Sequence, residues 1–314
     1  MRENFYKDYP EFHHTFDDGI SYLEYALYGN LSLPGSIHLE IVDASEKMMK
    51  ILNKIKEKIK TLSKEDLLSL GYSEKIIPYL QIDPLTNGSV TSRFDIVRTK
   101  GGFKFIELNN DTPFLIMENY QMDNILCEEL GSIPVLKNRQ NFLNESMILS
   151  LKEASEYLGK SLKDCTVAIM GYSYEEDLEE FTTLSFYQSI LLKNGINCHY
   201  VNYKDIRVDM DERDVLTAEV GTIDILLKFA YPYEFLIEDS YSEKDGSIGL
   251  DMLKLMEEKR VFLMNPPGSH ILQNKSTFAY LWELFEDRDF FNLEEKLFIE
   301  KYVPYTTTKG PEYF

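Results

Sequence analysis

A strand–helix–strand pattern in the middle of the chain indicates the fold class. Residues 166–171 form a short apolar run that ends in glycine, and an apolar helical pattern follows at about 180–193. Residues 198–202 then have the composition of a second strand. A helix of this length between two short strands is typical of a βαβ unit, in which the strands pair in parallel. The chain is therefore predicted to be an α/β protein.

Other segments extend this α/β pattern. Two further apolar runs, 223–229 and 261–264, are candidate strands, with a helical pattern near 248–259 between them. Apolar residues at helical spacing predict a helical amino-terminal segment from about 18 to 80. A long helix is predicted at about 140–159.

Composition narrows the classes of partner. The 314 residues include 53 Asp and Glu against 33 Lys and Arg, a formal net charge of −20. Such a charge disfavours a nucleic-acid partner, although an acidic enzyme can still bind phosphates through divalent cations. No stretch has the roughly 18 apolar residues of a spanning helix. Together with three cysteines in no metal-type spacing, this predicts a cytoplasmic protein with reduced thiols and no membrane partner.

Two glycines, Gly101 and Gly102, predict the turn of an antiparallel hairpin between strand-like segments. Residues two apart in a strand share a face, so acidic and amide side chains of the hairpin would project together. A three-residue loop, 100–102, with glycine in the left-handed position is a common closure. The pairs that this loop predicts are Thr99 with Phe103, Asp95 with Glu107, and Arg93 with Asn109.

The predicted hairpin places two carboxylates opposite each other. Asp95 and Glu107 would repel by a few tenths to about 1 kcal/mol unless a positive group lies between them. One candidate is Arg93, and another is a divalent cation, because two carboxylates and the Asn109 amide oxygen are typical Mg²⁺ ligands. The alternative is a surface hairpin whose acids and arginine form ordinary ion pairs.

Residues in and after the hairpin resemble the signature of the glutathionylspermidine synthase family, a group of ATP-grasp-type acid–amine ligases. Further matching segments occur in the family's order along the chain. The matching hairpin positions are Arg93, Asp95, Lys104, Glu107, Asn109, Asp111, Thr112, Pro113 and Glu118. The other matching positions are Tyr22, Glu24, Ala26, Tyr28, Glu179, Glu180, Thr183, Asp224, Pro232, Glu234, Asn274, Lys275 and Trp282.

The resemblance implies a ligase that uses ATP to convert a peptide carboxylate into an acyl phosphate, which an amine then attacks to form an amide. Asp95, Glu107 and Asn109 would hold the Mg²⁺ that bridges the ATP phosphates. Arg93 would neutralise charge on the transferring phosphoryl group, and Lys275 would reach the nucleotide phosphates. Positioning and charge neutralisation are what phosphoryl transfer requires of a protein.

Three further residues match positions that contact substrates in this family. Thr112 would touch a glutathione-like acyl substrate, and Glu179 and Glu180 would lie near the peptide or a polyamine. The acidic run 175–180 suits a cationic amine. Its alternative interpretation is a solvated loop whose acids favour the start of the following helix.

The chain also departs from the family pattern. Asn110 replaces a small residue, so the acid substrate is expected to differ from glutathione. The sequence ends where the family continues into its nucleotide-binding lobe, so residues 1–268 are predicted to be a pre-ATP-grasp-like region and 269–314 an incomplete ATP-grasp lobe. The first hypothesis is a ligase truncated in this chain. The alternatives are a non-catalytic metal- or peptide-binding module, and an acidic α/β protein that binds Mg²⁺ or Ca²⁺ structurally.

Overall fold

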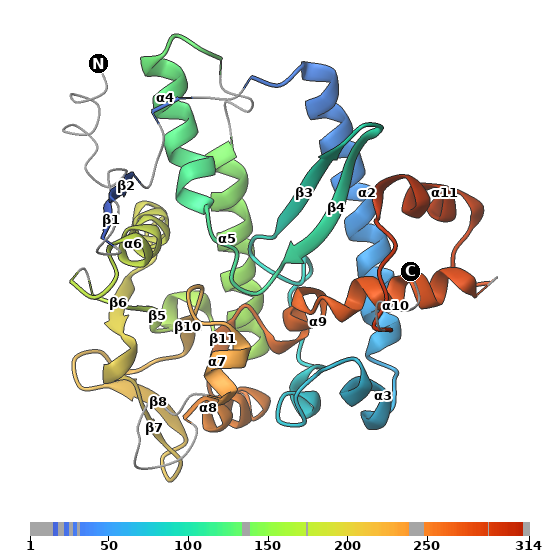
Figure 1. Cartoon of the computed structure of the whole chain (residues 1–314). Coiled ribbons are helices and arrows are strands. Elements are labelled where there is room, and N and C mark those ends of the chain that lie inside the picture. The colour runs from blue at the N-terminus through green and yellow to red at the C-terminus, as the bar shows by residue number, and fades with distance from the viewer. Residues whose placement is uncertain are drawn as a thin grey trace. The chain divides into compact units, whose positions relative to one another are not determined.

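The computed structural model contains both helices and strands and is an α/β protein, as predicted (Figure 1). It describes residues 15–17, 22–24, 28–29, 32–133, 139–173, 175–238, 248–287 and 289–309. Contacts divide the chain into two units. Unit 1 comprises Met1–Ser32, Phe114–Tyr231 and Lys259–Met264, and unit 2 comprises Leu33–Pro113, Pro232–Glu258 and Asn265–Phe314. The predicted division at 268/269 stays a prediction.

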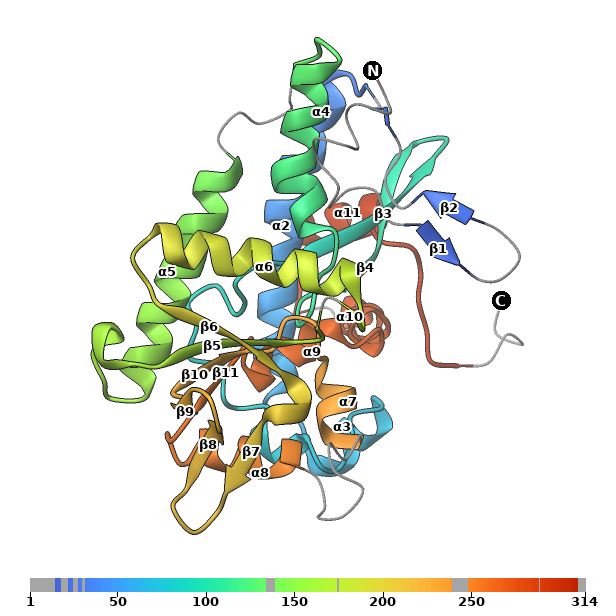
Figure 2. The ribbon, with the colours of Figure 1, turned by 90° about the vertical axis from the view of Figure 1, so that its left-hand side faces the viewer.

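Unit 1 contains a parallel four-stranded sheet in the order β11-β10-β5-β6. Its strands are β5 (Val167–Gly171), β6 (Cys198–Asn202), β10 (Ile225–Leu227) and β11 (Phe262–Met264). Helix α6 (Leu178–Lys193) connects β5 to β6, which confirms the predicted βαβ unit. Figure 2 shows α6 running along these two strands.

Helix α5 (Arg139–Tyr157) contacts β10 and β11, and α6 contacts β5 and β6. Buried strands such as β5, with all five residues buried, leave apolar faces that these helices cover. Gly159, with φ of 70°, follows the end of α5, and Lys160 N donates to Ser155 O there. This glycine ends the helix as predicted, because a left-handed residue closes the last turn.

The remaining elements of unit 1 are shorter. A π-helical turn, Glu118–Met122, leads into α4 (Asp123–Glu129). The antiparallel strands are β1 (Thr15–Asp17), β2 (Tyr22–Glu24), β7 (Arg207–Asp209), β8 (Asp214–Thr217) and β9 (Gly221–Thr222). The 3₁₀ turns of this unit are Leu162–Asp164 and Tyr203–Asp205. Strand β2 shows that the helix predicted from about residue 18 was wrong there. Residues 18–21 and 25–27 lie outside the described residues.

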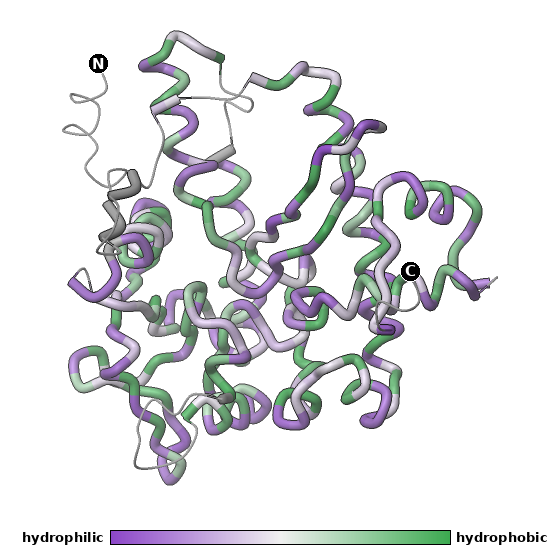
Figure 3. The backbone as a smooth tube through the Cα atoms, in the orientation of Figure 1, coloured by the Kyte–Doolittle hydropathy of each residue, from purple (hydrophilic) through white to green (hydrophobic). Residues whose placement is uncertain are grey.

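Unit 2 is built from helices around one antiparallel hairpin, β3 (Arg93–Thr99) and β4 (Gly102–Asn109). Figure 3 shows hydrophobic residues in the middle of both strands and hydrophilic residues at the tip. The helices are α2 (Gly35–Ile59), α3 (Lys64–Ser69), α7 (Tyr233–Glu238), α8 (Ile248–Glu257), α9 (His270–Gln273), α10 (Ser276–Glu286) and α11 (Leu293–Tyr302). The 3₁₀ turns are Ile77–Tyr79 and Pro267–Ser269.

The long helix α2 has the amphipathic pattern expected from the sequence. Its buried positions recur every three or four residues and include Met48, Ile51, Leu52, Ile55 and Ile59. Such a stripe packs one face of the helix into the unit 2 core, and lysines outside it, such as Lys50 and Lys58, are exposed. Lys56 is buried instead, and its Nζ lies 2.7 Å from Asp83 Oδ2. Within the described parts of the chain, we find no helix with the length and apolarity needed to cross a bilayer.

Candidate functional site

The hairpin brings its charged residues together in the predicted pairs. Asp95 faces Glu107, and Arg93 faces Asn109. The predicted pair of Thr99 with Phe103 is wrong, because Thr99 pairs with Gly102 across a shorter turn. A bulge beside Asp95 and Ile96 shifts the register by one residue and restores the predicted pairs at the open end of the hairpin.

Arg93 and Asp95 form a two-pronged ion pair on β3. Arg93 Nε donates to Asp95 Oδ1 at 2.8 Å, and Arg93 Nη2 donates to Asp95 Oδ2 at 3.2 Å. The side chains are 26% and 34% exposed, so both stay accessible to a ligand. The planar guanidinium is the group suited to bidentate contacts with carboxylates or phosphates.

Glu107 lies between an amide and a lysine. Its Oε1 accepts a hydrogen bond from Asn109 Nδ2 at 3.2 Å, and its Oε2 is 3.0 Å from Lys275 Nζ. Lys275 sits at the N-cap of α10 and is 81% exposed. The sequence-predicted residues Arg93, Asp95, Glu107, Asn109 and Lys275 therefore form one cluster in unit 2.

This cluster has the oxygen donors of a Mg²⁺ site. In the described parts of the chain, no group of three or more His, Cys, Asp and Glu side chains is arranged to hold a metal ion. The hairpin instead offers two facing carboxylates, on Asp95 and Glu107, and the amide of Asn109 beside them. Such a set suits Mg²⁺, which is commonly bound by one or two carboxylates together with waters and phosphates. Each carboxylate here also has a cationic partner, as the ion-pair alternative predicts.

The chain beyond Asn109 is held by a buried polar network. The Asn110 side chain is 1% exposed. Its Oδ1 accepts from the Ser89 and Ser92 hydroxyls at 3.0 and 2.7 Å, and its Nδ2 donates to Ser269 O at 2.9 Å. The residue that the sequence analysis linked to substrate choice is thus engaged inside the fold of unit 2.

A second asparagine completes this network and was not predicted. Asn265 Nδ2 donates to Asp111 O at 2.7 Å, and Asn265 Oδ1 accepts from Val90 N at 2.8 Å. Asp111 Oδ2 accepts from Tyr233 N at 3.1 Å. One signal for Asn265 was present in the sequence, namely that a polar residue directly follows the apolar run 261–264. Thr112, the predicted acyl-substrate contact, follows this segment and is 8% exposed.

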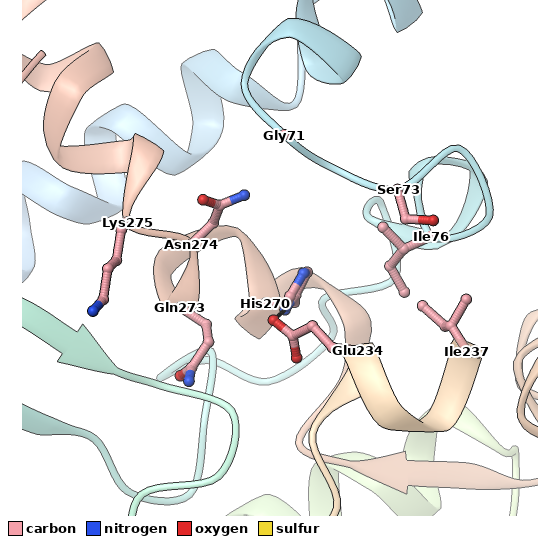
Figure 4. A pocket seen from close by; sticks show the side chains of 9 residues that line it. All are labelled: Gly71, Ser73, Ile76, Glu234, Ile237, His270, Gln273, Asn274 and Lys275. Carbon is pink, nitrogen blue, oxygen red and sulfur yellow. Dashed lines mark ion pairs between the residues drawn. The ribbon is translucent and has the colours of Figure 1, made fainter. Parts of the chain in front are cut away.

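A pocket of about 420 Å³ lies beside Lys275 within unit 2 (Figure 4). Its volume is in the range of small-molecule sites. His270, 7% exposed, faces Glu234, 50% exposed, with 3.6 Å between Nδ1 and Oε1. The sequence analysis assigned no role to this pair, because two residues so far apart in sequence give no spacing signal. The pocket is lined by Gly71, Ser73, Ile76, Glu234, Ile237, His270, Gln273, Asn274 and Lys275.

The acids Glu179 and Glu180 belong to unit 1, at the start of α6. Glu180 is buried, and its Oε1 accepts from Tyr172 N at 2.9 Å. Burial raises the pKa of Glu180 to about 7, against the opposing effect of that hydrogen bond and with support from Asp177. Burial also raises the pKa of Glu179. Glu180 can therefore gain or lose a proton near neutral pH.

Gly171 makes room for Glu180 at the end of β5. A Cβ at this position would lie 2.2 Å from Leu184 Cδ1, 2.4 Å from Tyr200 Oη and 3.1 Å from Glu180 Oε1. The glycine that ends the apolar run thus allows Tyr200 and Glu180 to approach the strand closely.

One family model and one solved structure are similar to this chain. A family model described as glutathionylspermidine synthase pre-ATP-grasp matches residues 7–306. The chain is also similar to a glutathione synthetase-like effector from Globodera pallida, at 10% identity and a TM-score of 0.49, over 86% of this chain and 59% of that one. The chain thus spans less than two thirds of that protein. Because the family model covers almost all of the sequence, this chain belongs to the glutathionylspermidine synthase pre-ATP-grasp family.

Proposed function

We propose that this chain carries the metal and phosphate site of an ATP-dependent acid–amine ligase, which joins a peptide carboxylate to an amine or polyamine. The observation that supports this best is the pairing of Asp95 with Glu107, with Arg93 and Lys275 beside them. Phosphoryl transfer needs carboxylates for a metal and cations for phosphate, and this set of side chains provides both.

The proposed roles follow from the chemistry of each side chain. Asp95, Glu107 and Asn109 are the residues that would hold Mg²⁺, which supplies charge neutralisation to the phosphates when bound. Arg93 orients the phosphoryl group that moves from ATP to the acid and neutralises its charge. It does so with the guanidinium N–H groups that donate to Asp95 in this structure. The Lys275 ammonium exchanges its contact with Glu107 for a nucleotide phosphate. Its side chain is 81% exposed, so surrounding residues do not hold it in place.

Each unit has its own candidate substrate residues in this proposal. Thr112 of unit 2 contacts the acid substrate, and Glu179 and Glu180 of unit 1 lie near the peptide or the polyamine. As a carboxylate, Glu180 would attract an ammonium group, and the net charge of −20 raises the local concentration of cations generally. We further propose that 1–268 is the pre-ATP-grasp region, that 269–314 begins the nucleotide-binding lobe, and that the protein works in the cytoplasm on small molecules.

A direct test uses Mn²⁺ as a paramagnetic substitute for Mg²⁺. Free Mn²⁺ is measured by electron paramagnetic resonance during titration of the full chain, of Asp95→Asn and of Glu107→Gln. Each variant is expected to weaken Mn²⁺ binding at least about tenfold while the circular dichroism spectrum stays unchanged. The matched control is Glu74→Gln, because Glu74 forms an exposed ion pair with Lys64 elsewhere in unit 2. Equal Mn²⁺ binding by all four proteins would refute the metal site.

Ligase activity is tested separately by phosphate release from ATP. The protein is expected to release phosphate from ATP only when a thiol-peptide acid and a polyamine are both present. Metal-dependent peptide binding with no ATP turnover would support the alternative of a non-catalytic module. Metal binding that responds to neither substrate would support the structural-metal alternative.

A further inference from the structure

Gln273 forms hydrogen bonds to the backbone directly after β4, the strand that carries Glu107 and Asn109 of the proposed metal site. Its Oε1 accepts two hydrogen bonds, from Asn110 N at 2.7 Å and from Asp111 N at 3.1 Å. Both N–H groups belong to residues that follow Asn109, the last residue of β4. This amide oxygen therefore acts together with the Asn110 and Asn265 contacts to hold the chain where it leaves the strand.

Gln273 also stands next to the proposed phosphate ligand. It is the last residue of α9, and Lys275 follows two residues later at the start of α10. Lys275 Nζ reaches back to Glu107 Oε2 at 3.0 Å. The segment 273–275 therefore contacts this strand region at two points. Lys275 contacts the Glu107 carboxylate on β4, and Gln273 contacts the backbone directly after β4.

The neighbouring residue, Asn274, forms hydrogen bonds to other parts of the chain. Figure 4 shows Gln273 and Asn274 leaving the ribbon in opposite directions, with Asn274 on the side of Gly71. Asn274 Nδ2 donates to Leu70 O at 3.4 Å, and Asn274 Oδ1 accepts from Ser276 N at 2.9 Å. The first contact joins this segment to Leu70 and the second is local to the start of α10, whereas Gln273 Oε1 bonds the end of β4.

We infer that Gln273 is a positioning residue of the proposed site, which holds the end of β4 so that the Asn109 amide lies beside Glu107. The inference rests on the proposed metal site. Without Gln273 Oε1 the N–H groups of Asn110 and Asp111 lose their acceptor, and the end of β4 depends on the remaining contacts of Asn110 and Asn265. A small shift of this strand end would move the Asn109 side chain relative to Glu107. Residues that orient metal ligands from behind typically change metal affinity by about 10- to 100-fold.

The test compares three replacements of Gln273 in the full chain by Mn²⁺ titration. Gln273→Leu removes the acceptor at similar volume and is expected to weaken Mn²⁺ binding about tenfold. Gln273→Glu keeps an oxygen for both N–H groups and is expected to bind Mn²⁺ within about threefold of the parent chain. Gln273→Asn keeps the amide on a shorter arm and is expected to fall between the two, so it decides the question if the leucine variant does not fold.

Two controls separate positioning from general loss of stability. Tyr72→Phe removes a different buried hydrogen bond to the same segment, from Tyr72 Oη to Ile271 O at 3.1 Å, and is expected to lower the Tm with no change in Mn²⁺ binding. In a chain that already carries Asn109→Ala, Gln273→Leu is expected to weaken Mn²⁺ binding by less than about a further twofold. The reason is that Gln273 is proposed to act by positioning the Asn109 side chain, which this background lacks.

The outcomes distinguish this inference from the proposed function. If Asp95→Asn abolishes Mn²⁺ binding while Gln273→Leu and Gln273→Asn leave it unchanged, the metal site stands and the role of Gln273 is refuted. A Gln273→Leu effect that is equally large in the Asn109→Ala background would also refute it. If Asp95→Asn itself leaves Mn²⁺ binding unchanged, the metal site fails first.

Discussion

Replacement of Glu180 by glutamine should stabilise the protein by an amount that grows as the pH rises above about 4.5 and is complete above about pH 7. Glu180 is buried at the start of α6, and burial raises its pKa from the usual 4.5 to about 7. Glutamine keeps the shape and the oxygen that accepts from Tyr172 N, while it removes the charge. The variant therefore isolates the free-energy cost of ionising a carboxyl group at this position.

The sign of the effect follows from proton binding. Between pH 4.5 and about 7 the folded state keeps a proton that the unfolded state has lost, so the stability of the parent chain falls as pH rises through this window. Above pH 7 the effect is constant, and below pH 4.5 both states are protonated. The pKa difference corresponds to at most about 3 kcal/mol, and solvent screening reduces the expected value to about 1–2 kcal/mol.

Urea unfolding of the parent chain and Glu180→Gln at pH 5 and pH 8 measures this difference. We expect nearly equal free energies of unfolding at pH 5 and an advantage of about 1–2 kcal/mol for the variant at pH 8. Glu176→Gln is the opposite control, because Lys204, the Ser173 N–H and Asn202 lower the pKa of Glu176 to about 2. Its replacement should destabilise the protein at pH 8. A constant difference between Glu180→Gln and the parent at both pH values would refute the reasoning.

Two further substitutions test the packing around the candidate residues. Gly171→Ala should destabilise the protein by about 2–3 kcal/mol, since the new Cβ would lie 2.2 Å from Leu184 Cδ1; thermal unfolding would show this, and an unchanged Tm would contradict the close approach. Asn110→Ala should cost about 2–4 kcal/mol, because it removes three side-chain hydrogen bonds of a buried residue, one of them to the buried Ser269 carbonyl; a loss below about 0.5 kcal/mol in urea unfolding would show that water or rearranged side chains replace them.

The sheet and the hairpin pairs could be predicted because their signals are local. The βαβ segment has apolar runs and helix-ending glycines within a few tens of residues, and β5, α6 and β6 form close to the predicted bounds. The pairing of Asp95 with Glu107 was predicted on a turn that proved one residue too long. The bulge compensated for that error, and no feature of the sequence analysis anticipated it.

The partners of buried polar groups could not be predicted in the same way. Asn265 and Gln273 act on the strand end near Asn110, more than a hundred residues earlier in the chain. An amide forms similar hydrogen bonds wherever the fold places it, so its residue type does not identify its partner. Strand β2 was missed for a related reason, because a three-residue strand depends more on its pairing partner than on its own pattern.

The charge balance of the hairpin cluster leads to one last expectation. Arg93 and Lys275 offset Asp95 and Glu107, so the cluster has no net formal charge, and the amides that hold the strand end add none. A divalent cation alone would leave two positive charges uncompensated at a partly exposed site. A polyphosphate that binds with the metal removes this excess and gives Arg93 and Lys275 new partners, so each ligand should strengthen binding of the other.

Isothermal titration of inorganic tripolyphosphate into the full chain, with and without Mg²⁺, tests this coupling. We expect tripolyphosphate to bind at least about tenfold more tightly when Mg²⁺ is present, equivalent to about 1.4 kcal/mol of coupling free energy. Asp95→Asn and Glu107→Gln should remove most of the Mg²⁺ effect, whereas Glu74→Gln should keep it. If the affinity for tripolyphosphate does not depend on Mg²⁺, the four charges form ordinary ion pairs, and the hairpin is a structural element without the metal chemistry proposed for it.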